Sequence, residues 1–220
     1  MQWMYPPNHG NPPNPRFEHS LTSVGSYLFL YGGGSTQNYP TTMHVYDTGM
    51  ISNVLVLLIV DSNQWGVAPV TNKPIKGLCS STFLTRDKDI FVFGGFDGHS
   101  RTNSSQWFSA EGAKWDPIMI EKGNRPEKRA AHASVMLGNK VVIHGGHNGK
   151  TRLSDIWVFD TVSSQWLIPI VNGTGPTPRS YHTACVVNNK IYIFGGYDGV
   201  TRNNDMYIIE EGNKNRMYEV

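Results

Sequence analysis

The sequence has only two cysteines in 220 residues, Cys79 and Cys185, and they do not form a closely spaced pair. This excludes a CxxC metal or redox motif and argues against a scaffold held by disulfides. The N-terminal segment also has no apolar stretch of the kind found in signal peptides. We therefore expect a reduced, cytoplasmic protein.

Long apolar runs and a large excess of one charge are also lacking. The longest apolar run, Val54–Val60, has seven residues, whereas a membrane-spanning helix needs about 20. The formal net charge is +2, with Lys and Arg scattered along the chain, so the overall field does not favour nucleic acid. Neither a membrane nor a nucleic acid is therefore an expected partner.

Glycine, by contrast, is abundant, with 23 residues, and it recurs in pairs that each follow an apolar strand. These segments are Tyr27–Gly33, Ile90–Gly95, Val141–Gly146 and Ile191–Gly196. The first glycines of the last three pairs are 51 and 50 residues apart, and the first interval is 62. A repeated spacing of this kind indicates that the chain is built from similar structural units.

Other positions keep the same phase. A His lies 13 residues before the glycine pair in three units (His19, His132 and His182), and Ser81 stands there in the second. Trp115 and Trp166 follow the aromatic third strand of their units. Together these features resemble the kelch repeat, which forms one four-stranded blade of a β-propeller. The pattern is similar to kelch domains of leucine-zipper-like regulators, Rab effectors and host-cell-factor-like scaffolds.

The resemblance implies an all-β protein, a kelch-type β-propeller with four recognisable four-stranded blades in a single domain, 1–220. Residues 1–15 are expected to hold the outermost strand and linker of a preceding repeat, because Gln2-Trp3 matches Gln165-Trp166. The blades are expected at 16–76, 77–127, 128–177 and 178–220, and the last strand of blade four at Met217–Val220. Four blades are fewer than this family usually has, so we expect either a four-blade ring or a fragment of a larger propeller with exposed apolar end faces.

Blade one contains an insertion, Gly49–Val60, whose removal restores a unit of 50 residues. Two explanations are open. The segment either extends the fourth strand or adds an edge strand, or it is not native sequence and comes from an event such as a retained intron of 36 nucleotides. We expect a peripheral protrusion, and its apolar run would promote aggregation if exposed.

The long polar loops between the second and third strands lie on one face of a propeller, where function concentrates. Arginines recur there, six residues after the second glycine, and Tyr39 takes that position in blade one. Guanidinium groups bind carboxylates and phosphates in a bidentate manner, although loop arginines are also often merely solvated. The predicted partner-binding residues are Arg101, Arg152, Arg202, His99, His147, Tyr197, Asp198 and Tyr39.

A second set of arginines, Arg16, Arg129 and Arg179, lies three residues before the repeated His position. We expect these side chains to be structural and to pair with backbone carbonyls or with Asp155 and Asp205. The repeated histidines are expected to form structural hydrogen bonds at the start of the first strands.

The predicted function is a non-enzymatic scaffold or adaptor that binds a partner protein or peptide, acidic or phosphorylated, through the loop-rich face. No catalytic residue, cofactor, metal ligand or small-molecule substrate is expected. The alternative is a metal-dependent kelch-propeller enzyme, in which His19, His132 and His182 would converge on the central channel. No carboxylate or Cys recurs beside these histidines at ligand spacing.

Overall fold

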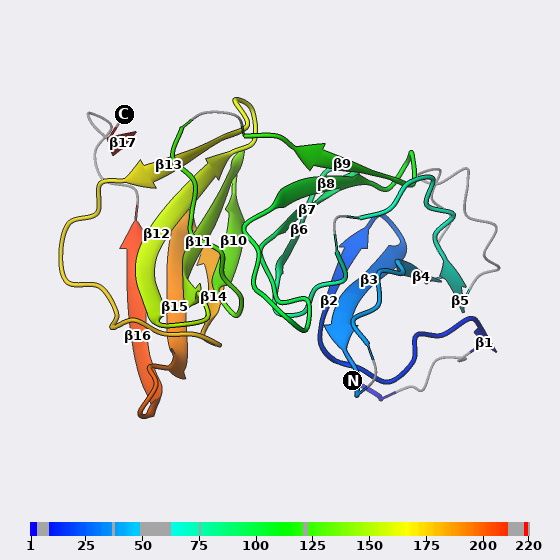
Figure 1. The fold of residues 1–220 in the computed structure, drawn as a ribbon, viewed down its shortest axis with the longest axis horizontal. Coiled ribbons are helices and arrows are strands. Elements are labelled where there is room, and N and C mark those ends of the chain that lie inside the picture. The colour runs from blue at the N-terminus through cyan, green and yellow to red at the C-terminus, as the bar shows by residue number, and fades with distance from the viewer. Residues whose placement is uncertain are drawn as a thin grey trace.

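The computed structural model describes residues 1–3, 9–36, 38–48, 63–74, 76–120, 123–210 and 218–219. The regular secondary structure in these ranges consists of strands, which form four sheets arranged as the blades of a β-propeller (Figure 1). The predicted all-β, kelch-type fold is therefore confirmed. Within the same ranges, no helix has the length and apolar character needed to cross a membrane.

Blade one contains β2 (Phe17–Val24), β3 (Tyr27–Gly34), β4 (His44–Asp47) and β5 (Gln64–Val67) in antiparallel order, and β1 (His9–Gly10) pairs in parallel with β5. The predicted insertion Gly49–Val60 lies outside the described residues. Trp3 is fully exposed and belongs to no strand. The prediction that Gln2-Trp3 forms an outermost strand is wrong, because neither residue belongs to a strand.

Blade two contains β6 (Thr82–Arg86), β7 (Asp89–Phe93), β8 (Ser105–Ser109) and β9 (Lys114–Ile118). Blade three contains β10 (Ala133–Leu137), β11 (Lys140–His147), β12 (Arg152–Asp160) and β13 (Gln165–Pro169), and blade four contains β14 (Thr183–Val187), β15 (Lys190–Tyr197) and β16 (Arg202–Glu210). The last strand, β17 (Tyr218–Glu219), pairs with β13 of blade three. The prediction that it completes blade four is wrong, since it adds to the edge of the neighbouring sheet.

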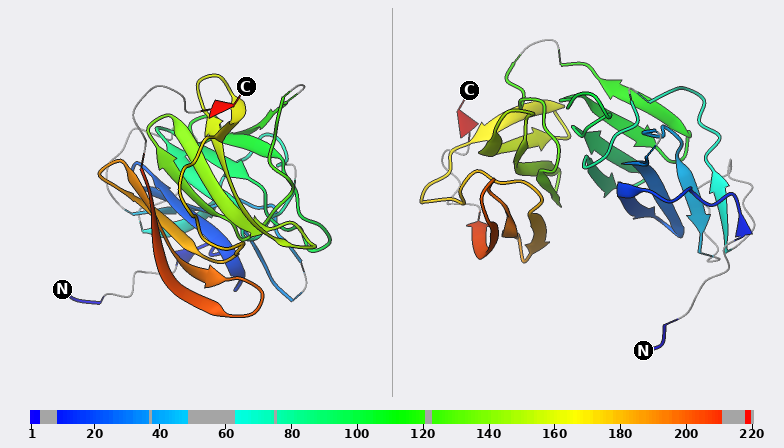
Figure 2. Two further views of the ribbon diagram at one scale, coloured as in Figure 1. Left: turned by 90° about the vertical axis from the view of Figure 1, so that its left-hand side faces the viewer. Right: turned by 60° about the horizontal axis from the view of Figure 1, so that its bottom comes forward.

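The blades follow one another around an arc in sequence order (Figure 2). An apolar cluster fills each interface: the first joins blades one and two, the second joins two and three, and the third joins three and four. Trp115 of blade two lies 4.9 Å from Tyr31 of blade one, and Trp166 of blade three lies 4.7 Å from Phe93 of blade two, measured between ring centroids. These two tryptophans therefore pack between blades.

The outer faces of the two end blades are apolar and exposed. Phe17 and Leu21 of β2 are 51% and 52% exposed, and Met206 and Ile208 of β16 are 61% and 54% exposed. Between neighbouring blades the same faces are covered by the next blade. Blades one and four each have one face without a neighbour, and these four side chains are exposed there.

In the first three blades, the glycine pairs lie where the backbone has a positive φ and approaches the neighbouring blade too closely for a side chain. Gly146 has φ +96°, and its N–H donates to the carbonyl of Arg179 in the next blade at 2.8 Å. A Cβ added at Gly146 would lie 2.8 Å from the carbonyl oxygen of Ala130 and 2.9 Å from Cβ of His132. The glycine therefore allows the strand to bulge and to contact the neighbouring blade at once.

Replacing Gly146 by alanine is expected to lower the free energy of unfolding by about 1–3 kcal/mol, because the left-handed backbone and the close carbonyl both oppose a methyl group. Denaturant titration would measure the loss. Gly175 is a matched control, since it has no positive φ and nothing within 4 Å of an added Cβ. A loss of equal size at Gly175 would contradict this explanation.

Candidate partner-binding site

Four equivalent residues bring the first strands of the blades together. Glu18, Ser80, Ala131 and Tyr181 each precede the repeated His position, and all have φ between +51° and +59°. The N–H groups of the last three donate to the preceding blade: Ser80 to the Glu18 carbonyl at 3.1 Å, Ala131 to the Ser80 carbonyl at 2.9 Å, and Tyr181 to the Ala131 carbonyl at 2.9 Å. The result is a backbone ladder that fixes the spacing of all four blades around one mouth.

A cavity of about 370 Å³ opens at this mouth, and residues of all four blades line it. Four of the predicted binding residues are among them: Tyr39, Arg101, His147 and Arg152. Tyr39 and Arg101 lie in the loops between the second and third strands of blades one and two. His147 and Arg152 are the strand residues on either side of that loop in blade three. The remaining walls include Phe17, Glu18, Phe96 and Tyr181.

The two arginines of the cavity lie on aromatic rings and have no acidic partner. Cζ of Arg101 is 5.2 Å from the Phe96 ring centroid, and Cζ of Arg152 is 4.5 Å from that of Tyr197. Neither guanidinium takes part in an ion pair among the described residues, and Nε of each is buried without a hydrogen-bond partner. Stacking on a ring fixes a guanidinium and leaves its edges available for a ligand.

Glu18 is the acidic side chain of this cavity, and local groups already engage it. The Ser80 hydroxyl donates to Glu18 Oε2 at 2.5 Å. Burial raises the pKa of the Cys79 thiol to about 12, and Glu18 adds to this effect, so the thiol is protonated and is not a nucleophile. With two guanidinium groups and one carboxylate, the mouth has an excess of positive charge.

His147 contributes a neutral ring. Burial lowers its pKa, and the positive charges of Arg101 and Arg152 lower it further. Its Nδ1 accepts a hydrogen bond from the Gly149 N–H at 3.0 Å, which holds the loop of blade three in place. A neutral imidazole of this kind presents Nε2 as a donor.

The other predicted residues do not line the cavity. Arg202 is exposed, with Cζ 5.7 Å from the Tyr197 ring centroid. Oδ1 of Asp198 accepts the N–H groups of Val200 and Thr201, and these bonds hold the pKa of Asp198 at about 2. His99 is exposed at a loop tip. Sequence reasoning missed Glu18, Phe96 and Tyr181, whose residue types do not recur from blade to blade.

The second set of arginines is structural in blades three and four, as predicted. Arg129 donates to both carboxylate oxygens of Asp155 at 2.7 Å, and Arg179 donates to those of Asp205 at 2.5 and 2.9 Å. Their side chains are 0% and 1% exposed. These guanidinium groups are therefore fully occupied and cannot serve a ligand.

Two of the three repeated histidines form structural hydrogen bonds. His132 Nε2 lies 2.6 Å from the Thr82 hydroxyl, and His182 Nε2 lies 2.9 Å from His144 Nδ1. His19 is exposed. Among the described residues no group of three or more His, Cys, Asp or Glu side chains is placed to hold a metal ion.

The family model described as "KLHDC2/KLHL20/DRC7 Kelch-repeats domain" matches residues 100–216. The chain is 33% identical over 159 residues to a leucine-zipper-like transcriptional regulator 1 homolog of Drosophila melanogaster, covering 69% of this chain and 15% of that protein. It is 27% identical over 154 residues to host cell factor of the same organism, covering 65% and 10%, and 27% identical over 168 residues to Kelch domain-containing protein 10 of Xenopus tropicalis, covering 71% and 37%. The chain thus spans a minor part of each of these relatives.

Proposed function

The chain belongs to the kelch-repeat family, and from that premise we propose that it is a non-enzymatic interaction module whose loop-rich face binds an acidic segment of a partner protein. Relatives named for kelch repeats and for regulatory factors support a protein-binding role. A phosphorylated segment would satisfy the same chemistry as a carboxylate-rich one.

The observation that carries this proposal is the pair of unpaired arginines at the mouth. Arg101 and Arg152 stack on aromatic rings, have buried Nε atoms without partners, and face a common cavity. No described carboxylate pairs with either guanidinium, so both are available to an anionic ligand, and a hydrogen bond to a charged group contributes about 1.5–3 kcal/mol. The aromatic walls suit the apolar parts of a peptide.

Alanine at Arg101 or at Arg152 is expected to weaken binding of an acidic peptide about thirtyfold, equivalent to about 2 kcal/mol. Ligands would be selected from a random peptide library, and their affinities measured by fluorescence anisotropy. The thermal midpoint of both variants is expected to stay close to that of the wild type, because neither arginine makes an ion pair.

Lys88 provides a matched control, since it is an exposed cation in a turn at the opposite ends of the strands and pairs with exposed Glu111. Alanine at Lys88 should leave the affinity unchanged. If the double variant of Arg101 and Arg152 binds every selected peptide as well as the wild type does, the proposal is wrong. If metal analysis of the purified protein finds a stoichiometric ion, the enzymatic alternative gains support instead.

We also propose a cytoplasmic location. Both cysteines are free in the structure, Cys79 buried and Cys185 exposed. An exposed free thiol is compatible with a reducing compartment.

A further inference from the structure

Blade one keeps the arginine of the structural ion pair but lacks its carboxylate. In blades three and four the carboxylate lies 26 residues after the arginine, at Asp155 and Asp205. Blade two has changed both members, to Leu78 and Ser104, and in blade one Thr42 stands 26 residues after Arg16. Blade one therefore carries half of a pair that the other blades either keep complete or lack completely.

Arg16 is nevertheless placed as its counterparts are. Its Nε donates to the Asn14 carbonyl at 3.0 Å and its Nη1 to the Gly32 carbonyl at 3.0 Å. The same two bonds in blade three join Arg129 to the carbonyls of Glu127 and Gly145, at 3.1 and 2.9 Å. The backbone of blade one thus holds the guanidinium in the orientation that, in blade three, receives a carboxylate.

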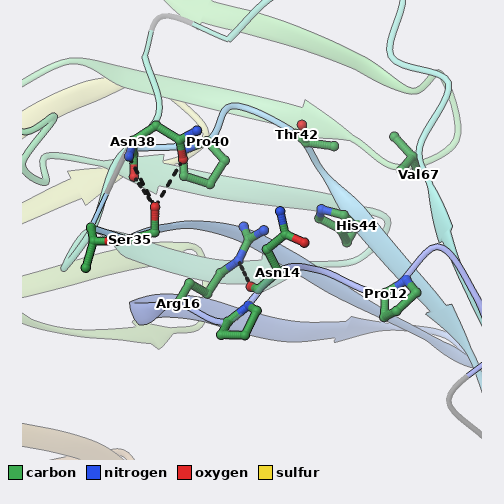
Figure 3. Close-up of a pocket in the computed structure, with 11 residues that line it drawn as sticks. Pro12, Asn14, Arg16, Ser35, Asn38, Pro40, Thr42, His44 and Val67 are labelled. Atoms are coloured by element: carbon green, nitrogen blue, oxygen red, sulfur yellow. Dashed lines mark hydrogen bonds between the residues drawn. The ribbon is translucent and has the colours of Figure 1, made fainter.

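The place of the missing carboxylate is a cavity of about 650 Å³. Figure 3 shows the Arg16 guanidinium among the lining residues, with Asn14 and His44 on one side and Asn38 and Pro40 on the other. None of the lining residues is acidic, and no described acidic side chain pairs with Arg16. The His44 ring is buried and close enough for the charge of Arg16 to lower its pKa, after the larger effect of burial.

We propose that this cavity receives an acidic side chain of a partner protein, whose carboxylate takes the place that Asp155 and Asp205 occupy in blades three and four. A carboxylate matches the planar fork of a guanidinium and forms two parallel hydrogen bonds with it. The cavity has room for several atoms beyond the carboxylate, so the side chain can enter from an extended segment.

This site differs from the one at the channel mouth and adds to it. The loop of blade one borders both cavities, with Tyr39 lining the mouth and Asn38 and Pro40 lining the cavity around Arg16. One acidic segment of a partner could therefore use both. The two proposals are tested separately, because the variants below do not alter Arg101 or Arg152.

The first experiment supplies the carboxylate within the chain. Thr42→Asp is expected to raise the thermal midpoint by about 2–4 °C relative to Thr42→Asn, its uncharged match. The gain should vanish in an Arg16→Gln background, in which no guanidinium is present. If Thr42→Asp is no more stable than Thr42→Asn, or if its gain persists without Arg16, position 42 does not face the guanidinium and the proposal fails.

The second experiment measures binding directly with small probes. Wild-type protein would be titrated with acetyl-Gly-Asp-Gly-amide, acetyl-Gly-Asn-Gly-amide and inorganic phosphate while the ¹H–¹⁵Nε resonance of Arg16 is followed by NMR. We expect a saturable shift with the Asp peptide, at least tenfold weaker binding of the Asn peptide, and loss of the Asp effect in Thr42→Asp. Equal binding of both peptides, or a shift that survives Thr42→Asp, would overturn the proposal, as would a response to phosphate alone.

Discussion

Replacing Arg129 by alanine is expected to lower the free energy of unfolding by about 3 kcal/mol. This is the lower end of the range found when one member of a buried ion pair is removed, because the Asp155 side chain is 40% exposed. The Arg129 side chain is 0% exposed and donates to the Gly145 carbonyl as well as to Asp155. Its loss leaves four acceptors without their donor, namely the carbonyls of Glu127 and Gly145 and both carboxylate oxygens of Asp155. It also leaves a void at the junction of blades two and three, where the Arg129 carbonyl accepts from the Gly95 N–H.

Urea titration monitored by tryptophan fluorescence would measure the change. Arg101→Ala is the matched control, because Arg101 lies on the same face without an ion pair, and its effect on stability should stay within about 0.5 kcal/mol. The two substitutions should therefore have different effects: Arg129→Ala should lower stability, and Arg101→Ala should weaken peptide binding. A loss below about 1 kcal/mol for Arg129→Ala would show that the ion pair contributes little.

The fold could be predicted from the sequence because its main requirements recur in register. The glycine pairs are needed where the backbone has positive φ and meets the carbonyl of the next blade, as at Gly95 and Gly146. The tryptophans recur because each fills the space between two sheets. A structural requirement that only one residue type meets leaves that residue at a regular spacing in the sequence. Four glycine pairs at similar spacing therefore indicate a propeller.

The backbone ladder could not be predicted in the same way. Its members are Glu18, Ser80, Ala131 and Tyr181, and they share only a left-handed backbone and an N–H and C=O in the right place. Almost any side chain can be attached to such a backbone at a cost of about 1–3 kcal/mol. The residue type is therefore a poor guide to this position. The position nevertheless matters for the site, because the ladder places Glu18 and Tyr181 at the cavity.

The three predicted loop arginines, Arg101, Arg152 and Arg202, differ in their contacts with the next blade. An added Cβ at Gly149 would lie 3.4 Å from Nη1 of Arg101, and one at Gly199 would lie 2.8 Å from Nη1 of Arg152. Each of these arginines thus reaches the loop of the next blade and lies at the mouth. Arg202 lies in the last described blade, so no described loop of a next blade covers it, and it is exposed. Its position in the repeat did not predict this difference.

The two terminal strands were predicted incorrectly because their partners depend on open sheet edges. The segment Tyr218–Glu219 pairs with β13, and His9–Gly10 pairs with β5 in parallel. Two residues contain too little pattern to specify a partner, since register is set by longer alternation of buried and exposed positions. The position of such short strands is decided by tertiary structure.

Acidification is expected to destabilise the propeller between about pH 6.5 and pH 4, above the range in which Asp97 and Asp198, with their lowered pKa values, affect stability. Burial lowers the pKa of His132 to about 3, that of His144 to about 4 and that of His182 to about 3. Charges from neighbouring strands act on the same rings: Arg129 and Arg179 lower these values and Asp155 raises those of His132 and His144. The folded protein therefore keeps these histidines neutral in a range where the unfolded chain protonates them.

The direction follows from the proton balance. Below the ordinary His pKa of about 6.5, the unfolded state binds more protons than the folded state, so stability falls as the pH falls and is fully present above that value. A histidine whose pKa is lowered from 6.5 to about 4, such as His144, lowers the free energy of unfolding by on the order of 3 kcal/mol once the pH is below about 4. The paired carboxylates act later, because Asp97 and Asp198, each with a pKa of about 2, lose their contribution only as the pH falls below about 4.

Thermal midpoints measured at half-unit steps from pH 7.5 to pH 3.5 would test this expectation. The wild type should lose stability progressively below pH 6.5, and His132→Asn should reduce the slope between pH 6.5 and pH 4.5. His19→Gln is the matched control, since His19 occupies the same repeat position but is exposed, and it should leave the slope unchanged. A profile that is flat from pH 7.5 to pH 4.5 would show that the buried histidines take up protons in the fold without cost, and that the His144–His182 contact tolerates a charge.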